Sequence, residues 1–188
     1  MKRAIKQDKD RIIDILVKSF KGNKSVDFVV GKSEKRRRVL MEYSYENCLE
    51  NGEVFISESG NSCILTKFSE SKANSLKLIL MDLKLALMGI GLPKILKVMK
   101  RESLINKKQP SSPFLYLWFI GVDPSSQGRG EGTKSLNFVI DTAKKKGLPV
   151  CLETSTQQNF AWYEKRGFKV YGKSNDFGFT LFFYKRES

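Results

Sequence analysis

Apolar residues along this chain follow two patterns, one with a helical period and one with a strand period. Three- and four-residue spacing predicts helices over 8–20, 33–49, 133–146 and 158–166. Alternating or continuous apolar runs predict strands over 53–58, 62–68, 114–122, 149–154, 168–172 and 178–185. Gly60-Asn61 predicts a tight hairpin between the first two strands. This order predicts an α/β domain layered around a mostly antiparallel sheet.

The most apolar region, residues 76–99, is interrupted by lysines, by Asp82 and by Pro93. It therefore falls short of the run of about 20 apolar residues that a membrane-spanning helix needs, and we expect no membrane partner. The spacing predicts two amphipathic helices instead, over 75–88 and 92–100. Gly89-Ile90-Gly91 is the expected flexible joint between them.

The segment from Phe114 to Thr133 carries the clearest chemical signal. An apolar strand runs into a turn at Pro124, and glycines follow at 128, 130 and 132 before a helix begins. Glycine lets main-chain N–H groups approach a bulky anion, and the first N–H groups of a helix lack partners within it. The helix dipole adds positive character at the same end. The segment therefore predicts a phosphate-binding pocket.

Three interpretations of these glycines compete. A dinucleotide site of Rossmann type needs G-x-G-x-x-G, whereas the spacing here is G-x-G-x-G. A P-loop needs G-x-x-x-x-G-K-S/T, but Thr133 stands where its last glycine should be. A plain glycine-rich turn between a strand and a helix is the third.

The surrounding residues extend the pattern. Val122, Pro124, Gln127 and the three glycines match V-x-P-x-x-R/Q-G-x-G-x-G/A, so this segment resembles the acetyl coenzyme A loop of the GNAT superfamily of N-acetyltransferases. A second signature about thirty residues on, Leu152-Glu-Thr-Ser155 with Asn159 and Tyr163-Glu-Lys-Arg-Gly-Phe168, is similar to the strand, loop and helix that hold the rest of the cosubstrate. The residues of this second signature are also similar to those of the branch of the superfamily that contains puromycin N-acetyltransferase.

The resemblance implies a GNAT-like fold over residues 1–188 as one domain. That fold is a mixed, mostly antiparallel sheet flanked by helices, with a helical insertion between the third and fourth strands. It also implies an enzyme that uses acetyl coenzyme A (acetyl-CoA) as cosubstrate. The expected reaction is direct acetyl transfer, through a ternary complex, to a primary amine of a small molecule. The alternative function is a non-catalytic acyl-CoA-binding module whose basic surface serves a macromolecule or nucleic acid.

The resemblance also assigns site residues. The cosubstrate is expected to contact the end of the strand over 114–122, the backbone amides of the glycine loop, and the helix over 158–166. The residues concerned are Ile120, Gly121, Val122, Gln127, Gly128, Arg129, Gly130, Glu131, Gly132, Thr133, Asn159 and Tyr163. The Val122 N–H is the expected oxyanion donor, Tyr163 the proton donor to the leaving thiolate, and Glu153 the general base. The alternatives are a Tyr163 packed on the sheet, a Glu153 bonded at the sheet edge, an Asn159 that caps its helix and a solvated Arg129.

Composition narrows the partners. The net charge is +14, from 34 basic and 20 acidic residues, and a polyanionic cosubstrate explains a small part of this excess. Without a recognisable nucleic-acid motif, nucleic acid is not the expected main partner. Three scattered cysteines and no histidine indicate neither a metal site nor a disulfide framework, but buried free thiols. The first ten residues lack the apolar core of a signal peptide, so a cytoplasmic location is expected. Whether the protein forms a homodimer stays open.

Overall fold

A central sheet organises the chain in the computed structural model, which describes residues 1–71, 73 and 75–188. Its strand order is β1-β2-β3-β4-β5-β7-β6, and only β4 and β5 are parallel to each other. The strands are β1 (Lys2–Arg3), β2 (Gly52–Ile56), β3 (Ser62–Phe68), β4 (Leu115–Val122), β5 (Val150–Thr154), β6 (Lys169–Ser174) and β7 (Leu181–Arg186). The expected mixed, mostly antiparallel sheet is confirmed.

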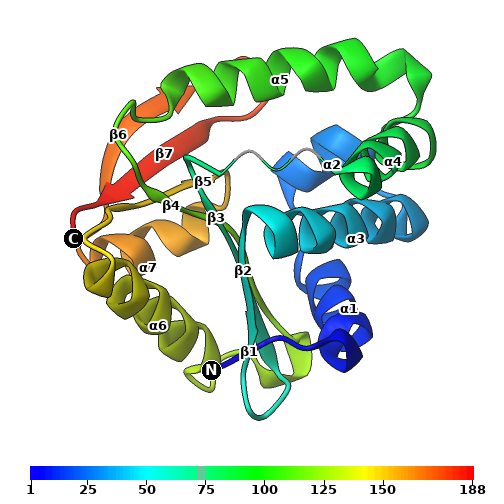
Figure 1. Cartoon of the computed structure of the whole chain (residues 1–188). Coiled ribbons are helices and arrows are strands. Elements are labelled where there is room, and N and C mark those ends of the chain that lie inside the picture. Colours follow the sequence, from blue (N-terminus) through cyan, green and yellow to red (C-terminus); the bar gives the residue numbers. More distant parts are fainter. Residues whose placement is uncertain (72, 74) are drawn as a thin grey trace.

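Helices cover both faces of this sheet (Figure 1). On one face lie α1 (Lys9–Ser19), α2 (Lys24–Val30) and α3 (Glu34–Asn51), and on the other lie α6 (Glu131–Lys145) and α7 (Phe160–Glu164). Successive side chains of a strand point to opposite faces of the sheet, so each strand contributes to both helical layers. Leu65 of β3 packs in the cluster with α1 and α3, whereas its neighbour Ile64 packs in the cluster with α6.

The segment between β3 and β4 forms the expected helical insertion. It contains α4 (Leu76–Lys84), a π-helical turn (Leu85–Ile90), a short 3-10 turn (Leu92–Lys94) and α5 (Ile95–Lys108). The second helix was predicted to end at residue 100, but it continues to Lys108. Ile105 holds this extension because it packs against Leu181 and Phe183 of β7, a contact that local spacing does not reveal. Among the described residues, no helix is both long and apolar enough to span a bilayer.

Sequence patterns missed two elements and misplaced one. Helix α2 has only seven residues, too few for a clear period. Asn23 caps its N-terminus, because its side chain accepts hydrogen bonds from the Ser25 and Val26 amides. Strand β1 is two residues long and pairs with the end of β2. The helix predicted over 158–166 is a 3-10 turn (Gln157–Asn159) followed by the shorter α7.

All three cysteines are buried free thiols, as predicted. Burial raises the pKa of Cys63 and of Cys151 to about 12 and raises that of Cys48 as well. Within the described part of the chain, no cluster of three or more acidic, cysteine or histidine side chains is placed to hold a metal ion.

Gly52 permits the close pairing of β2 with β3. A Cβ at this position would lie 1.9 Å from the Thr66 carbonyl oxygen and 2.7 Å from the Lys67 Cα. We expect Gly52→Ala to lower the free energy of unfolding by about 1–3 kcal/mol or more, because rigid backbone must shift. Urea denaturation followed by circular dichroism measures this loss.

Gly172→Ala is the matched control, since Gly172 also lies in a strand. There the nearest atom to a new Cβ would be the Phe183 Cδ2 at 3.8 Å, an ordinary contact. We expect its free energy of unfolding to change by less than about 0.5 kcal/mol. Equal losses in the two variants would contradict the steric explanation.

Candidate active site

Strands β4 and β5 pair only at Leu115 with Val150 and at Tyr116 with Cys151. Beyond that point β4 continues for six residues along β3 alone. On that side the Asp123 N–H donates to the Asn61 carbonyl at 2.8 Å. Antiparallel ladders alternate, so the N–H of Gly121 also faces β3 while those of Ile120 and Val122 face away from it. The gap between the strands therefore receives the amides of Ile120 and Val122.

The glycine loop follows directly. Asp123 accepts hydrogen bonds from the amide and hydroxyl of Ser125 and forms an ion pair with Arg11 at 2.9 Å. These contacts lower the pKa of its carboxyl. The Gln127 side chain donates to the Val122 carbonyl at 3.4 Å, so it orders the loop as expected. Gly128 and Gly130 have φ angles of 77° and 82°, which favour glycine.

A cavity of about 380 Å³ lies over this loop. It is lined by Val122, Ser126, Gln127, Gly128, Gly130, Glu131, Gly132, Thr133 and Trp162. Helix α6 starts at Glu131, so its first amides point into the same space. The Arg129 side chain is exposed and is not among the lining residues, which leaves its backbone as its contribution. Backbone amides, a helix N-terminus and open space together suit a diphosphate.

Neighbouring side chains hold two further residues of the loop, Glu131 and Thr133, in place. The Glu131 carboxylate accepts from the hydroxyls of Ser59 and Ser62, which ties it to the β2–β3 hairpin. The Thr133 hydroxyl accepts from Arg166 at 2.8 Å, and the Arg166 guanidinium lies 5.1 Å from the centre of the Trp162 ring. Sequence analysis missed Trp162 and Arg166. Both lie within the span of the second signature, where Glu153, Asn159 and Tyr163 were the residues singled out.

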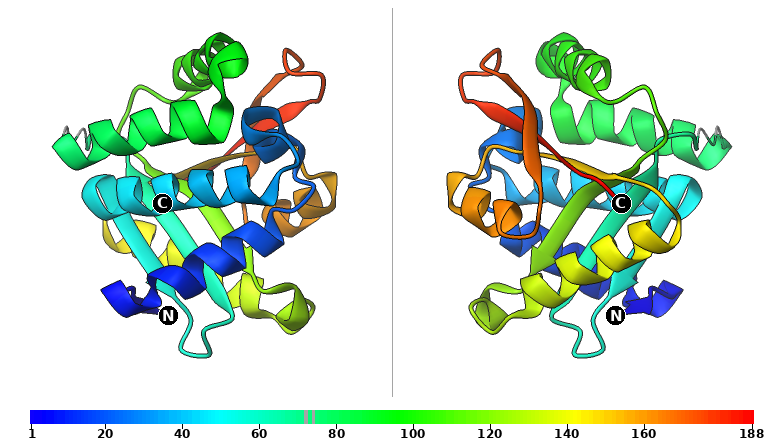
Figure 2. Two further views of the ribbon diagram at one scale, coloured as in Figure 1. Left: turned by 90° about the vertical axis from the view of Figure 1, so that its right-hand side faces the viewer. Right: turned by 90° about the vertical axis from the view of Figure 1, so that its left-hand side faces the viewer.

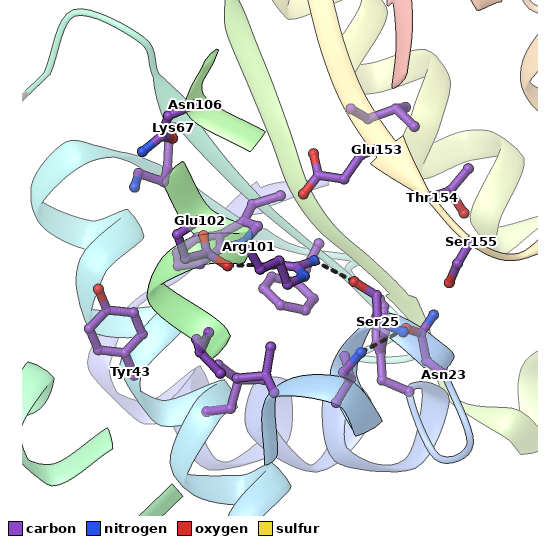
Figure 3. A pocket seen from close by; sticks show the side chains of 18 of the residues that line it. Asn23, Ser25, Tyr43, Lys67, Arg101, Glu102, Asn106, Glu153, Thr154 and Ser155 are labelled. Atoms are coloured by element: carbon purple, nitrogen blue, oxygen red, sulfur yellow. Dashed lines mark hydrogen bonds and ion pairs between the residues drawn. The ribbon is translucent and has the colours of Figure 1, made fainter. Parts of the chain in front are cut away.

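A second and larger cavity, of about 1090 Å³, opens beside the gap between β4 and β5 (Figure 3). The insertion contributes its apolar wall through Leu85, Ala86, Ile90, Ile95, Val98 and Met99. Aromatic side chains lie around it, from Phe20, Tyr43, Trp118 and Phe119. Ile120, Glu153, Asn159 and Tyr163 also line it, so four of the predicted site residues meet at one cavity.

Glu153 points into this cavity from β5 (Figure 3). The Tyr116 hydroxyl donates to its carboxylate at 2.5 Å. Burial raises the pKa of the Glu153 carboxyl above its ordinary value, while the Arg101 charge and the Tyr116 hydrogen bond oppose that rise. Tyr116 was not singled out in the sequence. The only signal was its alternation with the buried Leu115 and Leu117.

Arg101 reaches the same cavity from α5 and is only 7% exposed. Its guanidinium binds the Glu102 carboxylate and the Ser25 hydroxyl, as the dashed lines in Figure 3 show. The cavity lining therefore contains both signs of charge. Its acidic residues are Asp82, Glu102 and Glu153, and its basic residues are Lys67, Arg101 and Lys107.

Tyr163 fits both of its interpretations. Its ring packs 5.6 Å from that of Phe168 and 5.8 Å from that of Tyr184, measured between centroids, so it belongs to the core. It also lines the large cavity, and its hydroxyl has no hydrogen-bond partner among the described residues. Burial raises the pKa of this phenol above its ordinary value, so the hydroxyl keeps its proton across the ordinary pH range.

Asn159 and Ser155 offer polar groups to the cavity. Asn159 stands at the N-cap of α7 but makes no side-chain capping bond, which leaves its amide available. The Ser155 hydroxyl is buried and has no partner within the described part of the chain. A pantetheine arm laid between β4 and β5 would satisfy such groups, so the residues present fit acetyl-CoA.

Comparison with known proteins finds a matching family and similar folds. Residues 100–168 match the family described as "Acetyltransferase (GNAT) family". The fold is similar to an acetyltransferase of Corynebacterium glutamicum titled histone acetyltransferase HPA2 and related acetyltransferase, with 19% identity, TM-score 0.71, and 100% and 95% of the two chains covered. It is also similar to arylalkylamine N-acetyltransferase 2 of Aedes aegypti, with 14% identity, TM-score 0.69, and 99% and 97% covered.

A third similar structure is the PaiA N-acetyltransferase of Thermoplasma acidophilum in complex with coenzyme A, with 15% identity, TM-score 0.57, and 100% and 97% of the two chains covered. Residues 100–168 therefore match the GNAT acetyltransferase family, and the resemblance inferred from the loop is confirmed. This family match makes the protein an acyltransferase whose acetyl donor is acetyl-CoA. The likeness to the puromycin branch stays a prediction.

The loop glycines should differ in how well they tolerate substitution by alanine. Gly130 has a φ of 82°, so Gly130→Ala should strain the loop by about 1–2 kcal/mol and weaken coenzyme A binding by roughly 5- to 30-fold. At Gly132 a Cβ would meet Val122 and Trp162 at 3.5 and 3.6 Å, ordinary contacts, so Gly132→Ala should bind nearly as the wild type does. Isothermal titration calorimetry with coenzyme A compares them, and equal affinities would contradict the role of the Gly130 conformation.

Proposed function

We propose that this protein transfers the acetyl group of acetyl-CoA to a primary amine of a small molecule, by direct attack in a ternary complex. The observation that carries the proposal is the meeting of Glu153 and Tyr163 at one cavity beside the gap between β4 and β5. A carboxylate that can accept a proton and a phenol that can donate one are what amine acetylation requires at its two ends.

The amine must lose its charge before it can attack, because a lysine-like amine has a pKa near 10.4. Glu153 accepts that proton, directly or through water. Acetyl-CoA supplies the thioester carbonyl, and the oxyanion formed on attack accepts a hydrogen bond from the Val122 amide. Tyr163 then donates to the sulfur of the leaving thiolate. Tyr116 and Arg101 favour the ionised form of Glu153 and so oppose the burial that raises the pKa of its carboxyl.

A small acceptor with an aromatic or apolar body is favoured. Phe20, Tyr43, Trp118 and Phe119 line the cavity around the carboxylates. Two of the proteins with a similar fold are titled arylalkylamine N-acetyltransferases. Arylethylamines, aliphatic diamines and amino acids, each offered with acetyl-CoA, therefore form the first screen. Released thiol measures turnover, and mass spectrometry of the product identifies the acetylated nitrogen. Acetylation of a lysine peptide in preference to every small amine would contradict the proposal.

Glu153→Gln tests the general base. At neutral pH we expect kcat/KM to fall by about 10²–10⁴-fold, with partial recovery at high pH where the free amine is abundant. In the wild type, activity should fall as the pH drops through the raised pKa of Glu153, because the carboxyl then holds a proton. The same raised pKa means that ionised Glu153 costs stability above it, so the variant should melt no earlier than the wild type at pH 8.

Tyr116→Phe is the companion variant. It removes a hydrogen bond to the ionised carboxylate, so the pKa of Glu153 should rise and the acidic limb of the pH profile should move to higher pH. An unchanged profile in both variants would remove Glu153 from the role of base.

Tyr163→Phe tests the proton donor. The ring keeps its packing against Phe168 and Tyr184, so coenzyme A affinity and thermal stability should stay close to those of the wild type. Turnover should fall by about 10²-fold, because the thiolate loses its donor. Calorimetry and steady-state kinetics separate the two effects. A loss of binding as large as the loss of turnover would assign Tyr163 a structural role only.

A further inference from the structure

The insertion exposes an unusual amount of apolar side chain. Thirteen large hydrophobic residues are exposed in the described part of the chain, and nine of them lie between residues 76 and 99. Each of the nine is 53% to 79% exposed: Leu76, Ile79, Leu80, Leu83, Leu87, Met88, Leu92, Leu96 and Met99. We call this set the insertion apolar face. Exposed apolar patches of this kind mark a surface that meets an apolar partner.

This face points away from the rest of the protein. In α4 its members recur at three- and four-residue spacing, whereas Leu78 is buried and Leu85 lines the large cavity. In α5 Leu96 is exposed while Val98 is buried beneath it. Helices α4 and α5 lie together at one end of the molecule, outside the sheet layers (Figures 1 and 2). The buried residues of the insertion already form the wall of the large cavity. Its exposed apolar residues therefore have no packing role in the fold.

Positive charge accompanies the apolar face. Residues 75–109 contain eight basic and two acidic residues. Lys94, Lys97 and Lys100 are exposed next to Leu96 and Met99. Two lysines of α4 form ion pairs with Glu42 and Glu46 of α3. Among the described residues, Lys94, Lys97 and Lys100 form no ion pair. Two copies of this face would bring like charges together, whereas an anionic surface would meet them favourably.

We propose that the α4–α5 insertion lies in the interfacial region of an anionic phospholipid bilayer. Amphipathic helices with leucine-rich faces and lysines beside them bind in this way, with the apolar side chains at the boundary of the acyl chains and the ammonium groups at the headgroups. This binding needs one apolar face and no spanning segment, so it replaces the expectation that the protein has no membrane partner. Met99 belongs both to this face and to the cavity lining, which puts the acceptor cavity beside the lipid.

Vesicle flotation with the full-length protein tests the proposal. We expect the protein to float with vesicles in which one-third of the lipid is phosphatidylglycerol and the rest phosphatidylcholine, but not with phosphatidylcholine alone. The double variant Leu80→Gln, Leu83→Gln should bind at least tenfold more weakly. Neither leucine lines the cavity, so acetyltransferase activity and the circular dichroism spectrum should be unchanged. Leu49→Gln with Val170→Gln, which changes exposed apolar residues elsewhere, is the matched control and should bind like the wild type.

The lysines provide a second pair of variants. Lys97→Gln with Lys100→Gln should weaken binding to the anionic vesicles by roughly fivefold for each charge. Lys144→Gln with Lys145→Gln, at exposed positions of α6, should change it much less. Because the three native cysteines are buried, an environment-sensitive dye can be attached at Leu83→Cys, with Lys144→Cys as its control. Anionic vesicles should shift the emission of the first dye to the blue and leave the second unchanged.

Two results would overturn the proposal. One is equal binding, or none, to anionic and neutral vesicles. The other is a dimer in sedimentation experiments that the Leu80 and Leu83 variant abolishes while vesicles have no effect, which would assign the face to a second copy of this chain. Neither result touches the proposed acetyl transfer, which the amine screen tests separately.

Discussion

The separation of β4 from β5 is the constraint on which the site depends. After two parallel pairs the strands diverge, and the alternation of the β3–β4 ladder sends the Ile120 and Val122 amides into the opening. Burying such amides without partners would be costly, so the fold holds a position that a ligand with amide groups can satisfy. The glycine loop and α6 continue directly from this strand, which brings the diphosphate position into line with the opening.

In the proposed reaction, burial suits Glu153 and Tyr163 to opposite tasks, one as proton acceptor and the other as proton donor. It raises the pKa of the Glu153 carboxyl, which brings a carboxylate nearer to the range in which it can take a proton from an amine. It also raises the pKa of the Tyr163 phenol, which keeps that proton in place until a thiolate forms. The Tyr116 hydroxyl and the Arg101 charge limit the rise in the pKa of Glu153, the proposed base.

Sequence patterns predicted the features that depend on residues close together along the chain. Strand β3 has the predicted bounds, and most of the loop residues predicted between Val122 and Thr133 line one cavity because a single strand-turn-helix unit contains them. What depends on distant contacts was missed. Helix α5 is extended by Ile105 on β7, Tyr116 acquires its role from Glu153 across a strand pair, and Arg166 reaches Thr133 on another helix. No local period encodes such contacts.

The central claim concerns amides, so amide hydrogen exchange followed by NMR tests it most directly. Adding coenzyme A should slow exchange at Ile120, Val122 and the amides from Gly128 to Thr133. It should change Gly121 little, because the ladder already directs that N–H toward β3. Saturating coenzyme A that leaves Ile120 and Val122 exchanging as fast as before would contradict the account.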